Sequence, residues 1–295
     1  VLLPFLTGLF LASVAAPASA AWTVTNLHPL GEQSSRGFGA AGAQQVGWTS
    51  SSFGQNHASL WSGSAGSWVD LNPAGSIASE AFGASGSQQV GWAVVSNTAH
   101  ASLWNSTAGS WIDLDPVGSQ QSFAQATNGT QQVGRMYDGT TFRASLWSGN
   151  AASWVDLNPS GSLESQAFGI SASDQVGIAE VGGWTHASRW TGSGASWTNL
   201  NPAGSQFSRA LATDGTQQVG FADESSGTVR AALWSGTAAS WVSLNPAGSS
   251  QSEATGVLGN IQVGYAATPF QHAGLWEGTA GSFVDLHAYL SSDYM

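Results

Sequence analysis

The chain of 295 residues contains no cysteine and no lysine, and only 8% of its residues are charged. The absence of cysteine excludes a disulfide framework and any thiolate metal site. All six basic residues are arginine, and the net charge is −11. This balance leaves no cationic surface that could neutralise a phosphate backbone, so we expect no nucleic-acid partner. A hydrophobic fraction of 42%, with fifteen tryptophans, still predicts a well-packed globular protein.

Long apolar runs are also scarce, and the one that stands out is at the start of the sequence. Residues 1–20 form an apolar segment that ends in Ala-Ser-Ala, the pattern of a signal peptide with a small-residue cleavage site. Pro4 and Pro17 interrupt the segment and leave too short a run to span a bilayer. We therefore predict a signal peptide at 1–20, one domain at 21–295 with no transmembrane segment, and an extracellular or cell-surface location.

The rest of the sequence is a repeat with a period of 43 or 44 residues. The tripeptide Gln-Val-Gly occurs six times, with its valine at Val46, Val90, Val133, Val176, Val219 and Val263. A first tryptophan follows in every copy, at Trp61, Trp104, Trp147, Trp190, Trp234 and Trp276. A second follows seven residues later, at Trp68, Trp111, Trp154, Trp197 and Trp241, with Phe283 in the sixth copy. A period of this length is typical of propeller blades.

Each copy contains four short runs of alternating apolar residues separated by Gly, Ser and Asn. In the second copy they lie at 80–84, 89–94, 100–104 and 111–114. Such runs predict strands, and four strands in about 43 residues match one blade. We predict an all-β β-propeller with six to seven four-stranded blades, in which the tryptophans fill the space between blades. A β-solenoid or a sandwich-like repeat array is the alternative.

The blade count stays open at the sequence level. There are six full repeats and a partial copy, because residues 24–27 and 283–286 both match the fourth strand. Either six blades close with one strand to spare, or the sequence is an incomplete seven-bladed propeller, which is the interpretation we favour.

Length varies in only one connection, the hairpin between the second and third strands. Variable connections on a constant scaffold are where binding usually occurs. Aromatic and acidic side chains in these hairpins suit a sugar ring or a peptide. They are Tyr137, Asp138, Glu180, Trp184, Asp223, Glu224 and Phe270. We predict that they bind a ligand, with unconstrained loop variation as the alternative.

A basic or imidazole side chain begins the third strand in every copy: His57, His100, Arg143, His186, Arg230 and His272. Arginine does not ligate metals, so a shared metal site is not expected. We predict a structural hydrogen bond to a loop carbonyl or to the carboxylate that ends the fourth strand, as at Asp70 and Asp113. No nucleophile elbow, zinc motif, phosphate loop or calcium loop is present. We therefore expect no cofactor, no metal and no enzyme activity.

Written out, the second and neighbouring copies carry NHASLW at 56–61, WVDLNPAGS at 68–76, SEAFG at 79–83 and QVG at 89–91. In order and spacing these segments resemble the HAF repeat of bacterial extracellular proteins. That pattern runs His-Ala-Phe-Leu-Trp, Asp-Leu-Gly, Ser-x-Ala-x-Gly-Ile-Asn and Gln-Val-Val-Gly. A small residue here replaces the Phe, and Asn-Pro replaces the Gly. The resemblance covers residues 22–295 and implies secretion or surface display and a propeller-like fold, without catalytic residues.

The function that follows is a secreted or cell-surface binding module that recognises a glycan or an envelope protein. A structural or adhesive surface repeat protein without a defined small ligand is the alternative. A hydrolase or lyase acting on an extracellular polymer is the least favoured reading. The oligomeric state is not determined by the sequence.

Overall fold

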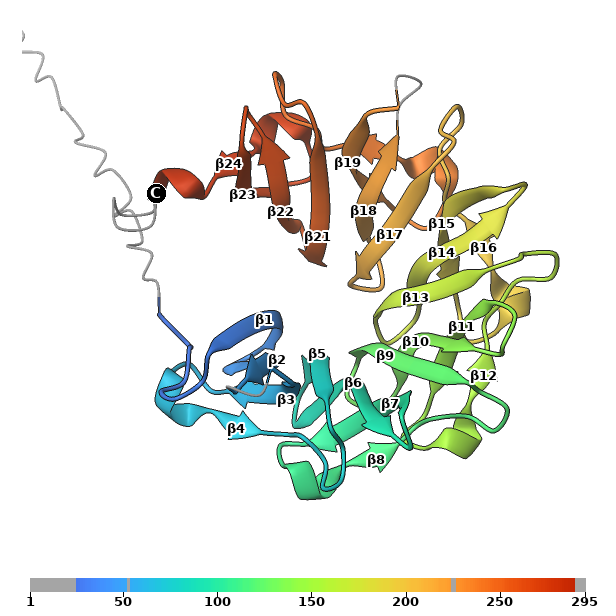
Figure 1. The fold of residues 1–295 in the computed structure, drawn as a ribbon. Helices are drawn as coiled ribbons and strands as arrows, with labels where there is room; N and C mark the ends of the chain where they lie inside the picture. The colour runs from blue at the N-terminus through green and yellow to red at the C-terminus, as the bar shows by residue number, and fades with distance from the viewer. Residues whose placement is uncertain (1–24, 52–53, 224–226, 290–295) are drawn as a thin grey trace, which may run out of the picture.

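The computed structural model describes residues 25–51, 54–223 and 227–289. It consists of six four-stranded antiparallel sheets that follow one another around a common axis as the blades of a β-propeller (Figure 1). Within each sheet the strands pair in sequence order, and we call them a to d from the axis outwards. The predicted fold class is therefore confirmed. The predicted signal peptide lies outside the described residues.

The first three blades have the following strands. Blade 1 contains β1 (Ser34–Ala41), β2 (Gln44–Ser50), β3 (Asn56–Trp61) and β4 (Val69–Asp70). Blade 2 contains β5 (Ser79–Ser85), β6 (Gln88–Val95), β7 (Thr98–Asn105) and β8 (Ile112–Asp113). Blade 3 contains β9 (Gln121–Thr127), β10 (Gln132–Tyr137), β11 (Phe142–Trp147) and β12 (Val155–Asp156).

The last three blades repeat this arrangement. Blade 4 contains β13 (Ser165–Ile170), β14 (Gln175–Val181), β15 (Trp184–Trp190) and β16 (Thr198–Asn199). Blade 5 contains β17 (Ser208–Thr213), β18 (Gln218–Asp223), β19 (Val229–Trp234) and β20 (Val242–Ser243). Blade 6 contains β21 (Ser252–Leu258), β22 (Ile261–Ala267), β23 (Gln271–Trp276) and β24 (Val284–Asp285).

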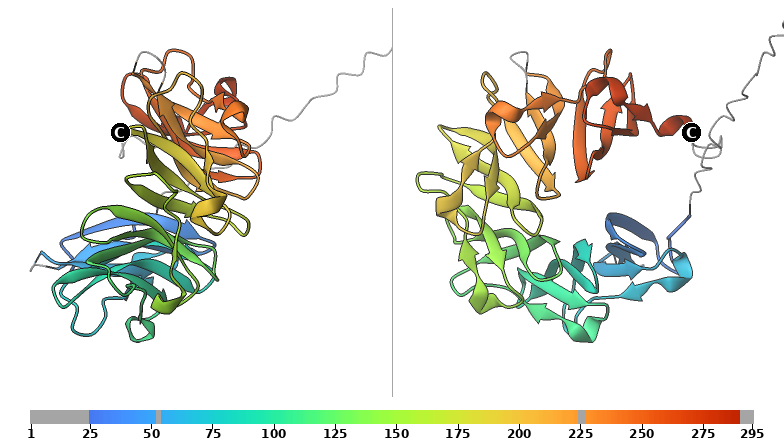
Figure 2. Two further views of the ribbon diagram at one scale, coloured as in Figure 1. Left: turned by 90° about the vertical axis from the view of Figure 1, so that its right-hand side faces the viewer. Right: turned by 180° about the vertical axis from the view of Figure 1, so that it is seen from behind.

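Short 3-10 helices join strand c to strand d in every blade. They are η1 (Ala65–Ser67), η2 (Ala108–Ser110), η3 (Ala151–Ser153), η4 (Gly194–Ser196), η5 (Ala238–Ser240) and η6 (Ala280–Ser282), and η7 (His287–Tyr289) follows the last strand. Figure 2 shows the short d strands and these turns on the outer rim of the blades. No helix in the described ranges has the length and hydrophobicity to cross a membrane.

The glycine of Gln-Val-Gly is required by a bulge in strand a. In blade 2, Ala81 pairs with Gly91 and Gly83 pairs with Val90, so Phe82 is the extra residue of the bulge. The carbonyl of Glu80 approaches so closely that a Cβ on Gly91 would lie 1.8 Å from its oxygen. The same contact would measure 1.8 to 2.0 Å in all six blades. Only glycine allows the two strands to approach this far.

The hydrophobic core lies between the blades. The face of a blade that carries the Gln-Val-Gly valine, here called the Val face, packs on the face of the next blade that carries the first tryptophan, called the Trp face. Between blades 1 and 2 the buried residues are Val46, Ala58, Leu60 and Leu71 on one side and Ala81, Ala93 and Trp104 on the other. Equivalent clusters fill the other four junctions. The first tryptophan of every copy is at most 1% exposed.

The second tryptophan has a different task, because it lies half-buried at the outer edge of the junction. Its indole N–H donates to a serine hydroxyl of strand c at 2.9 Å, from Trp68 to Ser59 and from Trp111 to Ser102. Trp154 and Trp197 make the same bond in blades 3 and 4. The prediction that indoles fill the space between blades holds for the first line of tryptophans, and the second line also ties strand d to strand c.

Candidate functional site

The hairpins between strands b and c use several of the predicted binding residues for their own structure. The Asp138 carboxylate accepts the Thr140 hydroxyl and also pairs with Arg143 Nε at 2.8 Å. The bond from Thr140, and next the bond from Arg143, hold the pKa of Asp138 well below its usual range, because both favour the charged carboxylate. The Tyr137 hydroxyl donates to the carbonyl of Gly139 at 3.1 Å. Both side chains therefore stabilise the turn of blade 3.

The acidic candidates of blades 4 and 5 lie in different surroundings. Asp223 is 8% exposed, and its Oδ1 accepts the backbone N–H groups of Gln206 and Phe207 at 2.9 and 2.8 Å. Glu180 lines a cavity of about 110 Å³ between blades 4 and 5, together with Glu164 and Arg209. Glu224 lies outside the described residues.

Two of the predicted aromatic residues are exposed at hairpin tips. Trp184 is 51% exposed on blade 4, and Phe270 is 75% exposed on blade 6. Blade 5 separates them, so the six candidates among the described residues do not converge on one site.

The basic residue at the start of strand c forms the hydrogen bond expected from the sequence in most blades. His57, His100 and His272 bond through Nδ1 to Asp70, Asp113 and Asp285 at 3.0, 2.8 and 2.7 Å. Arg143 reaches Asp156 at 2.7 Å, and His186 contacts the amide of Asn199 at 3.0 Å. In blade 5, where Ser243 replaces the acid, Arg230 donates instead to the carbonyl of Ser249 at 3.0 Å. These side chains link strand c to strand d or to the loop beyond it.

The turns between strands a and b, on the opposite side of the propeller from the b–c hairpins, exist in two forms. Blades 1, 2 and 6 have two-residue turns, and in blade 2 Ser85 pairs with Gln88 across Gly86, whose φ is +57°. Blades 3, 4 and 5 have four-residue turns, as where Thr127 pairs with Gln132. In blade 3, Asn128 Oδ1 caps the turn by accepting N–H groups from Thr130 and Gln131.

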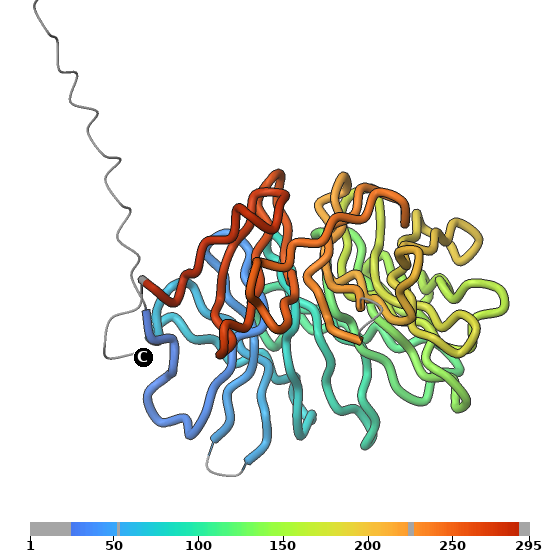
Figure 3. Tube along the Cα trace, turned by 90° about the horizontal axis from the view of Figure 1, so that it is seen from above, coloured from blue at the N-terminus to red at the C-terminus, as the bar shows by residue number. Residues whose placement is uncertain are grey.

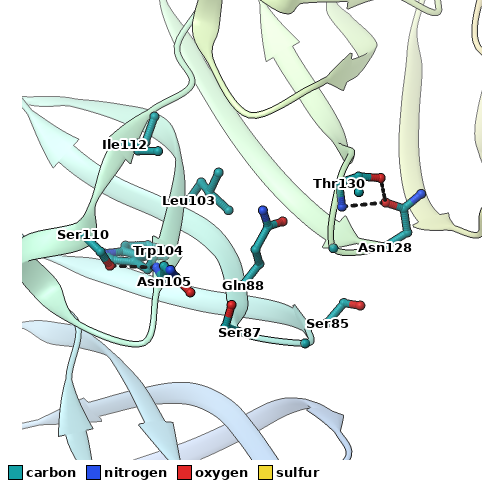
Figure 4. Close-up of a pocket in the computed structure, with 12 residues that line it drawn as sticks. Ser85, Ser87, Gln88, Leu103, Trp104, Asn105, Ser110, Ile112, Asn128 and Thr130 are labelled. Carbon is teal, nitrogen blue, oxygen red and sulfur yellow. Dashed lines mark hydrogen bonds between the residues drawn. The ribbon is translucent and has the colours of Figure 1, made fainter.

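One cavity lies where a two-residue turn is followed by a four-residue turn. This occurs between blades 2 and 3, and the cavity has a volume of about 510 Å³. Figure 4 shows Gln88 between the two turns, with Asn128 and Thr130 on one side and Asn105 and Ser110 on the other. The lining also includes Ser85, Gly86, Ser87, Leu103, Trp104, Ile112 and Gly129. We call this the interblade pocket.

The interblade pocket contains hydroxyl and amide groups and no charged side chain. Gln88 is held in place because its Oε1 accepts Thr127 Oγ1 and Gln132 Nε2, each at 3.1 Å. In Figure 4 the amide nitrogen of Gln88 lies on the side of Leu103 and its oxygen on the side of Asn128. Ile112, 42% exposed, supplies an apolar edge. Such a mixture of neutral donors, acceptors and apolar surface matches an uncharged ligand with several hydroxyl groups.

A second cavity of about 300 Å³ lies on the propeller axis. It is lined by the bulge residues of strand a, because the bulge turns their side chains towards the axis. These residues are Phe38, Phe82, Gln125, Phe168, Leu211 and Thr255. The rings of Phe38 and Phe82 pack edge to face at 5.3 Å between their centroids. The lining of this axial cavity combines large apolar side chains with the polar Gln125 and Thr255.

Sequence reasoning missed the interblade pocket. The spacing from the proline of one copy to the valine of the next Gln-Val-Gly is constant along the sequence, so it gives no sign that the a–b turns differ. The available signal was chemical: Asn128 and Asp214 precede Gly-Thr, a turn-capping pattern, whereas Ser85 precedes Gly-Ser. That difference separates the four-residue turns of blades 3 and 5 from the two-residue turn of blade 2, whereas the four-residue turn of blade 4 begins with Ser171.

No model of a known protein family matches the chain, and no curated protein matches it. Solved structures do superpose on it. A puromycin hydrolase superposes with a TM-score of 0.62 over 91% of this chain at 14% identity. A puromycin-hydrolysing peptidase of Mycobacterium tuberculosis gives 0.57 over 84% at 14% identity. TolB from Acinetobacter baumannii gives 0.53 over 82% of this chain and 62% of its own, at 9% identity.

These similarities establish the propeller fold, and they correct one sequence-based expectation. The prediction of no enzyme activity, drawn from the absence of catalytic motifs, is wrong as an exclusion, because a puromycin hydrolase and a puromycin-hydrolysing peptidase superpose on this chain. The chain spans about half of those proteins, 47% and 43% of their lengths.

Proposed function

We propose that the protein is a propeller module that binds an uncharged, hydroxyl-rich ligand, a glycan, in the interblade pocket. The observation that carries the proposal is a cavity of about 510 Å³ lined by amides and hydroxyls with an apolar edge and without charge. A sugar ring presents the same combination of hydroxyl groups and apolar C–H faces. Recognition of such ligands depends on a few fixed polar groups in a concave site.

Export to the extracellular space or the cell surface belongs to this proposal. It is supported by the signal-peptide pattern of residues 1–20. The order and spacing of the repeat motifs likewise support membership of the HAF-repeat family.

A glycan array with the full chain tests the ligand class. The blocking variant Asn105→Phe places a ring in the pocket, because Asn105 lines it while its structural bond is made by its backbone N–H. We expect binding to fall at least tenfold. Ser148→Phe is the matched control, because Ser148 has the equivalent exposed position in blade 3 and makes the equivalent backbone bond.

The b–c hairpins are tested in the same experiment through Trp184→Ala. Loss of glycan binding in Trp184→Ala, with normal binding by Asn105→Phe, would move the site to the hairpin face. Binding to envelope proteins but to no glycan would contradict the ligand class proposed here.

Hydrolysis is the second candidate function, and one arrangement favours it. Glu164 and Glu180 line the same cavity between blades 4 and 5, beside Arg209. Two carboxylates in one cavity can act as an acid and a base in hydrolysis. Turnover of aminoacyl amides such as puromycin, or of glycosides, by the full chain and its loss in Glu180→Gln would support this function.

A further inference from the structure

The Val face of blade 6 differs from the same face of the other five blades. The valine of Gln-Val-Gly is fully buried in blades 1 to 5, but Val263 is 42% exposed. Ala273 is exposed, whereas its counterparts Ala58 and Ala101 are fully buried. The exposed apolar surface continues to Leu258 and Ile261, which are 80% and 45% exposed in the β21–β22 hairpin. Blade 6 therefore presents the same packing surface as the others, and no Trp face within residues 25–51, 54–223 and 227–289 lies against it.

On the other side of this opening, the residues before blade 1 make the hydrogen bonds that elsewhere follow a strand d. At the junction of blades 1 and 2, the N–H of Asn72 donates to Asp70, and its side chain contacts Ser76 and Ser79. Before blade 1, the N–H of His28 donates to Asn26 Oδ1 at 2.9 Å.

The side chain of His28 completes the match. It contacts Glu32 O at 3.1 Å and Ser35 Oγ at 2.9 Å, the counterparts of the two contacts of Asn72. Residues 25–27 thus take the position of a strand d in front of blade 1. No other strand of the described chain pairs with them.

We infer that the Val face of blade 6 docks a three-stranded unit of the same repeat. The unit would place a small residue from each of its strands a and b and a tryptophan from its strand c on Val263, Ala273 and Leu275. Its strand c would pair with residues 25–27, which would serve as strand d of the unit. Figure 3 shows blade 6 and residues at the start of blade 1 on the same side of the propeller, and Figure 1 shows them facing one another around the axis.

The chemistry of the partner follows from the five junctions already present. Each joins a Val face to a Trp face whose buried side chains are mostly alanine and tryptophan. An exposed apolar face of this kind marks an interaction site. The contact face of the partner unit therefore carries small apolar side chains and one tryptophan. Its strand c has a free edge that can pair with residues 25–27.

The test adds such a three-stranded unit to the C-terminal end of the chain. One variant carries a copy of residues 77–105 after residue 291, in place of residues 292–295. Its control carries the same copy with the residues corresponding to Ala81 and Trp104 replaced by aspartate and serine. We expect the first variant to melt at least about 3 °C above the unextended chain, since each kcal/mol of stability shifts Tm by about 2–4 °C at this size. The control should show no rise.

Amide hydrogen exchange gives an independent readout. Exchange at residues 25–27 and 263 should slow at least tenfold in the extended variant and not in the control. Val263→Asp should leave the unextended chain folded, because the residue is partly exposed. The same substitution in the extended variant should abolish the rise in Tm.

Equal melting temperatures with and without the copy, or unchanged exchange at residues 25–27, would overturn the inference. Sedimentation velocity tests whether a second copy of the chain occupies the Val face of blade 6. A dimer of the unextended chain that Val263→Asp dissociates would assign the face to a second copy instead, and would overturn it too.

Discussion

The junction between blades 1 and 2 and the junction between blades 4 and 5 have the same backbone frame but different chemistry. In the first, Leu60 is 4% exposed in an apolar cluster, and Gln89 Nε2 donates to Gln44 across the junction. In the second, Arg189 takes the place of the leucine, and Asp174 takes the place of the glutamine acceptor.

The charged junction works because the buried carboxylate has a full set of donors. Asp174 is 0% exposed and accepts Arg189 Nε at 2.8 Å and, from blade 5, Gln218 Nε2 and Thr213 Oγ1 at 3.0 Å each. Buried charges are tolerated when they are paired and hydrogen-bonded. The difference shows that the alanine and tryptophan positions define the junction, while the side chains near the a–b turns can change if they change together.

The largest effect should come from removing the first tryptophan, which both junctions contain. Trp104→Ala should lower the free energy of unfolding by about 3–5 kcal/mol, because it leaves a large cavity in a buried cluster. Chemical denaturation monitored by circular dichroism measures the loss. Trp184→Ala, at an exposed hairpin tip, is the control and should change stability by no more than about 0.5 kcal/mol. Equal losses in both variants would refute a core between the blades.

The next effect should come from breaking the buried pair. Asp174→Ala should cost about 3 kcal/mol, the lower end for a buried ion pair, because Arg189 is 24% exposed and can reach solvent. Urea denaturation measures this.

The double variant Asp174→Gln with Arg189→Leu gives the junction between blades 4 and 5 the glutamine and leucine of the junction between blades 1 and 2. Its stability should return to within about 1 kcal/mol of the original chain, since volume and hydrogen bonding are restored together. A double variant as unstable as Asp174→Ala would show that the two junctions are not interchangeable.

A smaller effect concerns the second tryptophan. Ser102→Ala removes the acceptor of the Trp111 indole N–H and should cost about 1 kcal/mol. Blade 5 offers the reverse experiment, because Ala232 stands where blades 1 to 4 have serine and the Trp241 N–H is buried without a partner in the described chain. Ala232→Ser should therefore stabilise the protein in thermal denaturation. A loss of stability in Ala232→Ser would show that this position is limited by space.

The smallest expected effect depends on pH. Burial raises the pKa of Glu253, although the Tyr265 hydroxyl, at 3.2 Å, and Arg209 oppose the shift. The folded chain thus binds this proton more tightly than the unfolded chain, whose value is about 4.3. The resulting cost is absent below that value and grows as pH rises through the folded pKa.

Glu253→Gln should therefore gain stability relative to the original chain as pH rises from about 4 to 7, by less than about 1 kcal/mol after solvent screening. Unfolding free energies at several pH values measure the difference. A constant difference over this range would contradict the raised pKa.

Much of the fold could be predicted from the sequence because its signals are local. Alternation over 89–94 and 100–104 predicted β6 (Gln88–Val95) and β7 (Thr98–Asn105) to within two residues at each end. The candidate site could not be predicted in the same way. Asp138 and Asp223 were expected to face a ligand. Asp138 instead accepts N–H groups of its own turn, as short acidic side chains often do. Asp223 accepts the N–H groups of Gln206 and Phe207, which lie far from it in sequence.

The sequence by itself determined the blade: four strands, a glycine opposite a bulge, and a tryptophan for each flank, since these depend on contacts within one copy or between identical copies. Only the tertiary structure decided where unlike features of neighbouring copies meet. The interblade pocket exists because a two-residue turn adjoins a four-residue turn, and the open face of blade 6 exists because no Trp face covers it in the described chain. Both are relations between two surfaces, which a pattern within one copy does not contain.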